Sequence, residues 1–146
     1  MYTTGELPRP RVAIPLLIID EATQSGGWLE GRTKLTKLVF LAEREADTAY
    51  RRLTSPDDPY SFVPYNYGPF SSDLLADLEI LARHNLLEIG LRNLDSRGRA
   101  VEYLYRVIPE GHRLAQSIRD DEAAQALREL ARALRKQETA TGIVTS

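Results

Sequence analysis

This sequence of 146 residues lacks cysteine altogether and contains only two histidines. The absence of cysteine excludes disulfide bonds, thiolate ligands for metals and cysteine nucleophiles. His84 and His112 are too few for a metal site, and no acidic cluster at helical spacing accompanies them. We therefore expect neither a metal nor another cofactor.

Long apolar segments are missing too. The longest apolar run, residues 12–19, contains Pro15 and is far shorter than the roughly 20 residues that a membrane-spanning helix needs. Residues 1–10 have no apolar core of the kind found in signal peptides. We expect a cytoplasmic protein with no membrane partner.

The sequence also lacks an excess of positive charge. Lysine and arginine number 19 against 21 aspartates and glutamates, which gives a net charge of -2. The chain as a whole does not attract nucleic acid or an anionic membrane, so phosphate binding would need a local basic patch. The apolar fraction of 42% is typical of a compact globular domain.

Two helices are predicted in the first third of the chain. Residues 11–22 are dense enough in apolar side chains to form a buried helix, provided that Pro15 lies in its first turn. Residues 30–46 place Leu35, Leu38 and Val39 on one face and charged residues elsewhere, which is the pattern of an amphipathic helix.

An aromatic, proline-bearing segment leads into a third helix. The prolines and aspartates of residues 50–60 predict a loop, and "YSFVPYNYGPF" predicts an extended, edge-like segment. Gly68 is expected to take a positive φ or a crowded position that only glycine reaches at low cost. Ser71 or Ser72 can cap the helix that follows, which ends near His84, where the imidazole suits the free carbonyls.

The remaining pattern predicts a hairpin followed by helix. Residues 87–107 alternate between apolar and polar side chains on both sides of the turn sequence "NLDSRGR". Pro109 suits the first turn of a further helix, and residues 120–137 continue it with an apolar stripe. This element order predicts an α+β, mainly helical winged helix-turn-helix domain over residues 1–115. Residues 116–146 form a C-terminal helical extension, suited to dimerisation, and a frayed tail.

One hydrophobic core is expected to join the second helix, the third helix and the hairpin. Its predicted members are Leu35, Leu38, Val39, Leu74, Leu75, Leu78, Leu81, Val101 and Tyr103.

Two segments also carry a family resemblance. "GRTKLTKLVFLAE" and "YSFVPYNYGPFSSDLLADLEILARHNLLE" resemble the YwgA-like prokaryotic winged-helix proteins and, more distantly, the SocA-type Panacea antitoxins. The turn "YNYGPFS" is the most specific part of the likeness. The segment "YRVIPEGHRLA" is similar to the region after the wing in winged-helix regulators, except that Ile108 replaces the usual Thr or Ser cap. The YwgA-like resemblance implies a regulatory role without catalytic residues, and the Panacea resemblance implies protein partners.

Three motifs have a structural interpretation beside a functional one. "GGWLEGRT" approximates a phosphate-binding loop, but Arg32 replaces its lysine, and glycines that end one helix and begin the next explain it as well. Ser71 and Ser72 lack a nearby base, which favours helix capping over catalysis. The aromatic side chains of Tyr50, Tyr60, Phe62, Tyr65, Tyr67 and Phe70 form either a ligand cage or packing for the loop. Together these readings favour a protein that is not an enzyme.

Two binding functions remain, and the first is recognition of duplex DNA. Cations near the start of the second helix and on the hairpin would contact phosphates, while the third helix reads bases. The predicted DNA-binding residues are Arg32, Lys34, Lys37, Ser71, Ser72, Arg83, Arg92, Arg97 and Arg99. Acidic side chains on the third helix oppose this hypothesis, because they would repel phosphates.

The second function is that of a protein-interaction module, such as an antitoxin, an adaptor or an accessory subunit. Asp73 and Asp77, expected on the exposed face of the third helix, would meet a basic partner. Leu127, Leu130 and Leu134 of the C-terminal stripe would pair with another helix, including that of a second copy. A solvated acidic face and a stripe packed on its own core explain the same patterns.

Overall fold

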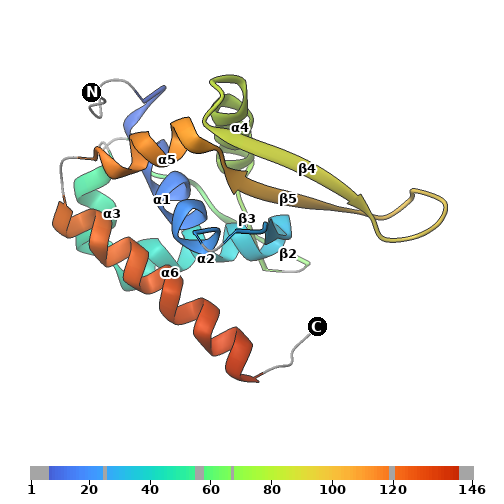
Figure 1. Ribbon diagram of the computed structural model, residues 1–146. Coiled ribbons are helices and arrows are strands. Elements are labelled where there is room, and N and C mark those ends of the chain that lie inside the picture. The colour runs from blue at the N-terminus through green and yellow to red at the C-terminus, as the bar shows by residue number, and fades with distance from the viewer. Residues whose placement is uncertain (1–6, 25, 55–57, 67, 119–120, 142–146) are drawn as a thin grey trace.

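The computed structural model describes residues 7–24, 26–54, 58–66, 68–118 and 121–141, and in the last range side chains as far as Leu134. The chain forms an α+β fold in which helices predominate (Figure 1). In chain order the elements are η2 (Pro10–Val12), α1 (Ala13–Ala22), β1 (Leu29–Glu30), α2 (Arg32–Glu45), α3 (Asp47–Leu53), β2 (Val63–Tyr65), β3 (Gly68–Phe70), α4 (Ser72–Arg83), β4 (Leu87–Asn93), β5 (Val101–Val107), α5 (Pro109–Gln116) and α6 (Asp121–Thr141).

Two small antiparallel sheets accompany the helices. The first has the strand order β1-β5-β4, with Leu29 opposite Tyr105 and Leu87 opposite Val107. The second is the hairpin β2–β3, in which Tyr65 lies opposite Gly68. Figure 1 shows the β4–β5 hairpin leaving the helical body and projecting from it as an arm.

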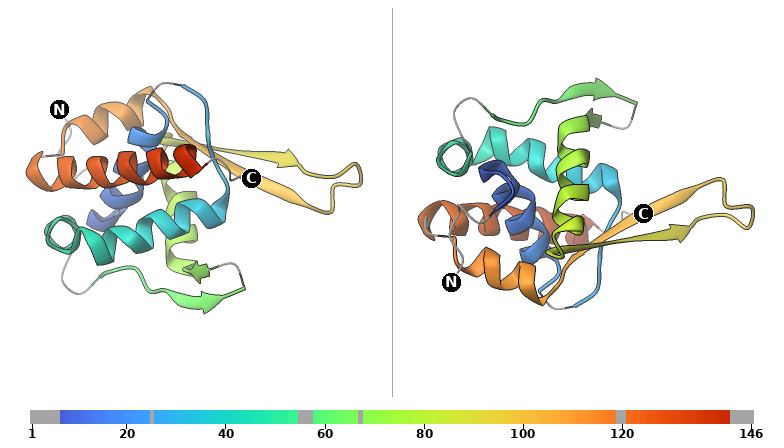
Figure 2. Two further views of the ribbon diagram at one scale, coloured as in Figure 1. Left: turned by 90° about the horizontal axis from the view of Figure 1, so that it is seen from below. Right: turned by 90° about the horizontal axis from the view of Figure 1, so that it is seen from above.

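Helix α1 lies at the centre of the fold. Its residues from Ala13 to Ile19 are all buried, because the segment is apolar on every side and has no polar face to present to water. It contacts α2, α3, α5, α6 and β5, and Figure 2 shows the other helices arranged around it. Pro15 lies in the first turn of α1, as predicted.

Local interactions fix the ends of α4. Ser71 is the N-cap residue, and its hydroxyl accepts a hydrogen bond from the Leu74 backbone N–H at 3.2 Å. At the other end, His84 Nδ1 lies 2.9 Å from the Ile80 carbonyl oxygen.

Gly68 has a φ of +125°, which confirms the prediction of a positive angle. Glycine is required there by the backbone conformation and not by crowding.

The base of the β4–β5 hairpin is packed closely against the body. A Cβ added to Gly111 would lie 2.0 Å from the Leu86 carbonyl oxygen, so α5 and the start of β4 meet backbone to backbone. A Cβ added to Gly90 would lie 3.3 Å from the Trp28 ring. Beyond this base the hairpin is open to solvent, and every residue from Leu91 to Ala100 is exposed.

Several sequence predictions differ from the fold. The predicted loop over residues 50–60 begins inside α3, where Tyr50 and Leu53 are buried and Arg51 pairs with Asp47 one turn earlier. Val101 was expected in the core but is 42% exposed, because it lies on the projecting part of the hairpin. The predicted continuous C-terminal helix is two helices, α5 and α6.

Of the two interpretations of the apolar stripe on α6, the structure confirms packing on the protein's own core. Leu127 is fully buried, and Leu130 and Leu134 are partly buried against the same core, because α6 packs across α1 and α3. Arg128 reinforces this contact by pairing with Asp20 at 2.8 Å. The described residues of 116–118 and 121–134 thus pack with the preceding helices, and Leu127 is not available to a second copy.

None of the helices in the part of the chain that the structure describes is long and apolar enough to cross a bilayer.

Truncation of Leu78 tests the placement of α4. Leu78 is 1% exposed, so Leu78→Ala should lower the free energy of unfolding by about 2–5 kcal/mol through lost burial and the cavity left behind. Leu91→Ala is the matched control, because Leu91 is 62% exposed and its truncation should change stability by less than about 0.5 kcal/mol. Chemical denaturation measures both, and equal effects would contradict the described position of α4.

Candidate functional site

A buried ion pair joins α4 to the segment before α1. Arg11 Nε donates to Asp77 Oδ2 at 2.7 Å, and their side chains are only 6% and 1% exposed. Arg9 Nη1 lies 3.5 Å from Asp77 Oδ1, which has no hydrogen bond to a described residue. Asp77 is therefore neutralised from two directions inside the protein.

Further groups extend this charged cluster along the same side of α4. Arg11 Nη1 donates to Asp58 Oδ1 at 2.9 Å and lies 3.5 Å from Asp73 Oδ2. The Arg11 guanidinium also lies 4.6 Å from the centre of the Tyr60 ring, a cation–π contact. The cluster holds η2, the residue 58–60 segment and α4 together.

Two buried tyrosines complete the cluster. The Tyr50 hydroxyl accepts a hydrogen bond from the Tyr60 backbone N–H at 3.0 Å. Burial raises the pKa of Tyr50 to about 12. Burial and the nearby charge of Asp77 raise the pKa of Tyr60 well above its ordinary value. Tyr50 and Tyr60 are 2% and 3% exposed, so these two aromatics pack the loop and do not form an open cage.

The predicted acidic face of α4 needs correction. Asp77 points into the protein, and Asp73 is only partly exposed and accepts hydrogen bonds from the Ser71 hydroxyl and the Ser61 backbone N–H. The predicted protein interface through Asp73 and Asp77 is therefore wrong for Asp77. Sequence reasoning missed the pairing with Arg11, although Asp77 follows Leu74 by three residues and precedes Leu81 by four, which places it on the buried face.

The outward face of α4 carries few charges. Ser72, Ala76, Glu79 and Arg83 are exposed along it. Ser71, predicted among the DNA-binding residues, is 1% exposed and caps the helix, so its side chain cannot reach a partner. Of the two serines, only Ser72 faces solvent.

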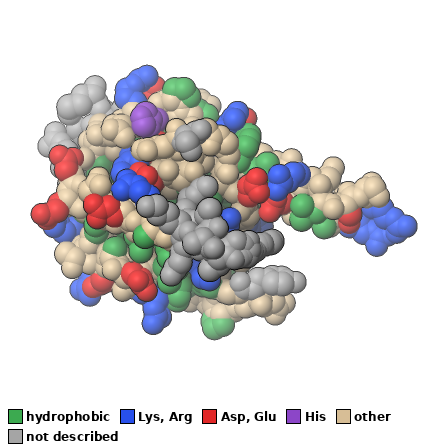
Figure 3. Space-filling view, turned by 60° about the horizontal axis from the view of Figure 1, so that its bottom comes forward, with side chains coloured by type: hydrophobic (Ala, Val, Ile, Leu, Met, Phe, Trp, Pro, Cys, Tyr) green, Lys and Arg blue, Asp and Glu red, His purple; other side chains and the backbone are tan. Residues whose placement is uncertain are grey.

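The exposed part of the β4–β5 hairpin combines arginines with apolar side chains. Arg97 and Arg99 are exposed at its tip, where both backbone N–H groups donate to Asp95 Oδ1, and neither side chain pairs with a described residue. Figure 3 shows basic side chains gathered at this tip. Leu91 and Leu94 are 62% and 58% exposed nearby.

The other residues predicted to contact phosphate lie away from the hairpin tip, and some of them already contact other side chains. Arg92 pairs with Glu30 at 3.2 Å and with Glu102, so its charge is already matched within the sheet. Lys37 is exposed on α2, and Lys34 is partly buried. Arg32 stacks on Tyr103, with its guanidinium carbon 3.7 Å from the ring centre. The structure thus leaves Lys37, Arg83, Arg97 and Arg99 as exposed cations, but does not unite them in one patch.

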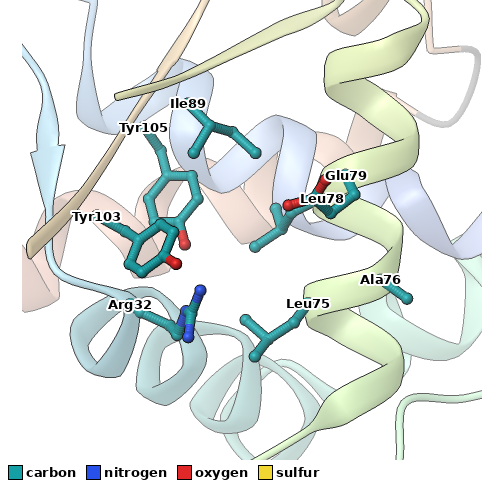
Figure 4. Close-up of a pocket in the computed structure, with 8 residues that line it drawn as sticks. All are labelled: Arg32, Leu75, Ala76, Leu78, Glu79, Ile89, Tyr103 and Tyr105. Atoms are coloured by element: carbon teal, nitrogen blue, oxygen red, sulfur yellow. The ribbon is translucent and has the colours of Figure 1, made fainter. Parts of the chain in front are cut away.

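A pocket of about 190 Å³ lies between α4, the start of α2 and the base of the hairpin. Figure 4 shows the Arg32 guanidinium and the hydroxyls of Tyr103 and Tyr105 directed into the space, with Glu79 at the α4 side. Arg32 Nε is buried and has no hydrogen-bond partner among the described residues. Sequence reasoning assigned Arg32 to DNA and did not find this pocket.

Two further candidates from the sequence are a metal site and the phosphate-binding motif. Across the described ranges, no group of three or more His, Asp or Glu side chains is arranged to hold a metal ion. In "GGWLEGRT", Gly26, Gly27 and Gly31 all have positive φ, and Gly31 is the N-cap of α2. The segment therefore links two helices, as its structural interpretation predicted, and does not follow a strand as a phosphate-binding loop would.

The chain was compared with protein-family models, with curated proteins and with solved structures, and it matches none of them.

Removal of the Asp77 charge tests the buried pair. Asp77→Asn should lower the free energy of unfolding by about 3 kcal/mol, since Arg11 would lose its closest counterion and keep only Asp58 and Asp73. Glu79→Gln, on the exposed face of the same helix, should change stability by less than about 0.5 kcal/mol. Denaturant titrations in which both variants match the parent would exclude a stabilising role for the pair.

Proposed function

We propose that this chain is a non-enzymatic, DNA-binding regulator of the winged-helix type. In this proposal α4 is the recognition helix and the β4–β5 hairpin is the wing. The sheet order β1-β5-β4, with a helix directly before the hairpin, supports the assignment because winged-helix domains use that arrangement. The YwgA-like resemblance of the α2 and α4 segments agrees with a prokaryotic regulator.

The observation that carries the proposal is the arginine pair at the tip of the projecting hairpin. Arg97 and Arg99 lie beyond the body, beside no described carboxylate partner, where a wing contacts phosphates (Figure 3). Such contacts fix orientation, while Ser72, Ala76 and Arg83 on the exposed face of α4 would face base edges.

The internal ion pairs also weaken the main electrostatic objection to DNA binding. Asp73 and Asp77 belong to the Arg11 cluster, so their charges are largely compensated before any phosphate approaches. Glu79 is the carboxylate that remains on the outward face of α4. The cluster sets two arginines against three aspartates, so one negative charge remains there besides that of Glu79, and the repulsion is reduced without being removed.

Charge reversal at the wing tests this function. The double variant Arg97→Glu/Arg99→Glu should weaken binding to random duplex DNA at least tenfold at low salt, because two phosphate contacts become repulsive. Fluorescence anisotropy at two salt concentrations measures this, and the parent's affinity should fall steeply as salt rises.

The matched control reverses Arg51 and Arg113, two exposed arginines on α3 and α5, away from the hairpin. It changes net charge equally and should bind DNA like the parent. Equal loss in both double variants would show that only overall charge matters. No salt-dependent binding by the parent would refute the proposed function.

Exposed apolar residues favour a second candidate, a protein-interaction module on the same scaffold. Leu91, Leu94 and Val101 are 62%, 58% and 42% exposed on the hairpin, and β4 is an edge strand of its sheet. A long edge strand with exposed apolar side chains is a surface to which another chain can pair. The partner would meet the hairpin, and not Asp77 or Leu127.

Polar substitution of the hairpin distinguishes the two functions. Leu91→Ser/Leu94→Ser should leave DNA affinity within about twofold of the parent if Arg97 and Arg99 bind phosphate, since no charge changes. If the hairpin binds a protein, the same variant should lose a partner that the parent retains in pull-downs from extract. Retention of that partner by the serine variant would exclude the hairpin as its docking surface.

A further inference from the structure

We propose that the pocket between α4 and the base of the β4–β5 hairpin binds a small zwitterionic ligand, an α-amino acid with an apolar side chain. The proposal concerns a ligand site separate from the exposed arginines of the hairpin tip, and it does not depend on DNA binding. Its basis is the combination of one cation, one anion, two phenols and apolar walls around a single space (Figure 4).

Arg32 is the group that would hold the carboxylate. Its guanidinium is fixed by stacking on Tyr103 at 3.7 Å, so little side-chain freedom is left to lose on binding. It forms no ion pair with a described carboxylate, and its buried Nε lacks a hydrogen-bond partner. Because the Nε is itself shielded from the pocket, the terminal nitrogens of the guanidinium would meet the ligand, and their planar arrangement matches the two oxygens of a carboxylate.

The tyrosines strengthen this anion-binding end. Figure 4 shows the hydroxyls of Tyr103 and Tyr105 near the Arg32 guanidinium. Burial raises the pKa of Tyr105, so its phenol stays protonated at neutral pH and remains a hydrogen-bond donor. A carboxylate placed here would meet a cation and two O–H groups.

Glu79 supplies the opposite charge. Its carboxylate lines the pocket from α4, across the space from Arg32 (Figure 4), and pairs with no described cation. A simple anion would be repelled by Glu79, and a simple cation by Arg32. A ligand with both charges satisfies the two ends together, which is why the pair favours an amino acid over a phosphate or a polyamine.

The size and walls of the pocket limit the ligand further. A volume of about 190 Å³ corresponds to the space of about six water molecules, below the range of drug-sized sites. Leu75, Leu78 and Ile89 form the apolar part of the lining. An aliphatic side chain would displace water from these walls, whereas a peptide or a nucleotide would not fit.

Calorimetric titration of the intact chain tests the ligand class. The probes are L-leucine, 4-methylpentanoate, which lacks the amino group, and 3-methylbutylamine, which lacks the carboxylate. L-leucine should bind, and each single-charge probe should bind at least about tenfold more weakly, because one charge-assisted contact is lost. If 4-methylpentanoate binds as tightly as L-leucine, the zwitterion assignment is wrong. If no probe binds at up to about 10 mM, the site itself is refuted.

Variants locate the binding to this pocket. Arg32→Gln and Glu79→Gln should each weaken L-leucine binding at least about tenfold. Arg97→Gln and Glu45→Gln are exposed, chemically matched controls outside the pocket and should bind like the parent. Binding that survives both pocket variants would overturn the proposal.

A blocking variant separates loss of the site from loss of the fold. Leu75 points into the pocket (Figure 4) and is only partly buried, so Leu75→Trp should fill the space while leaving the thermal unfolding temperature close to that of the parent. Loss of L-leucine binding in this folded variant supports the proposal. Unchanged binding with the pocket filled would place the ligand elsewhere and refute it.

Discussion

The ion pair between Arg11 and Asp77 is the interaction on which the arrangement of this fold depends. A carboxylate that is 1% exposed is tolerable in a protein interior only beside a compensating cation. Arg11 precedes the central helix α1, and Asp77 lies in the middle of α4, so the pair fixes the helix beside the hairpin to the core of the molecule. The orientation of α4 determines which of its side chains reach solvent, and therefore which chemistry its surface offers.

The same orientation gives α4 two different sides. The inner side carries Asp77 and the leucines, while the outer side presents Ser72, Ala76, Glu79 and Arg83. Between α4 and the hairpin base, Arg32 and Glu79 keep opposite charges around one small space. The charges of Arg11 and Asp77 are thus paired and buried and stabilise the fold. The charges of Arg32 and Glu79 remain without a described ion-pair partner. The latter are the ones available for recognition.

Much of the fold could be predicted from local patterns. The apolar run of α1, the amphipathic period of α2, the Ser71 cap and the alternation of the hairpin strands all depend on neighbouring residues. Long-range facts could not be read in this way: Arg11 meets Asp77 across 66 positions, and Leu127 is covered by helices from the other end of the chain. The candidate sites were predicted least accurately. A pattern of charges in the sequence does not reveal whether Asp77 faces solvent, or that Arg32 turns toward Tyr103.

The hairpin is anchored at its base, where β5 pairs with β1, Leu87 and Tyr105 are buried, and Gly90 lies against Trp28. The two strands have seven residues each and extend roughly 24 Å at about 3.4 Å per residue. The hairpin is therefore a long arm that is attached to the body at one end, and its base is the fulcrum of any rotation. A rotation of about 5° at the fulcrum would move the tip by about 2 Å over that length. The pocket containing Ile89 and Tyr105 lies at this base, so a change in its packing that rotated the hairpin would displace the arginines at the far end further than it moved the pocket walls.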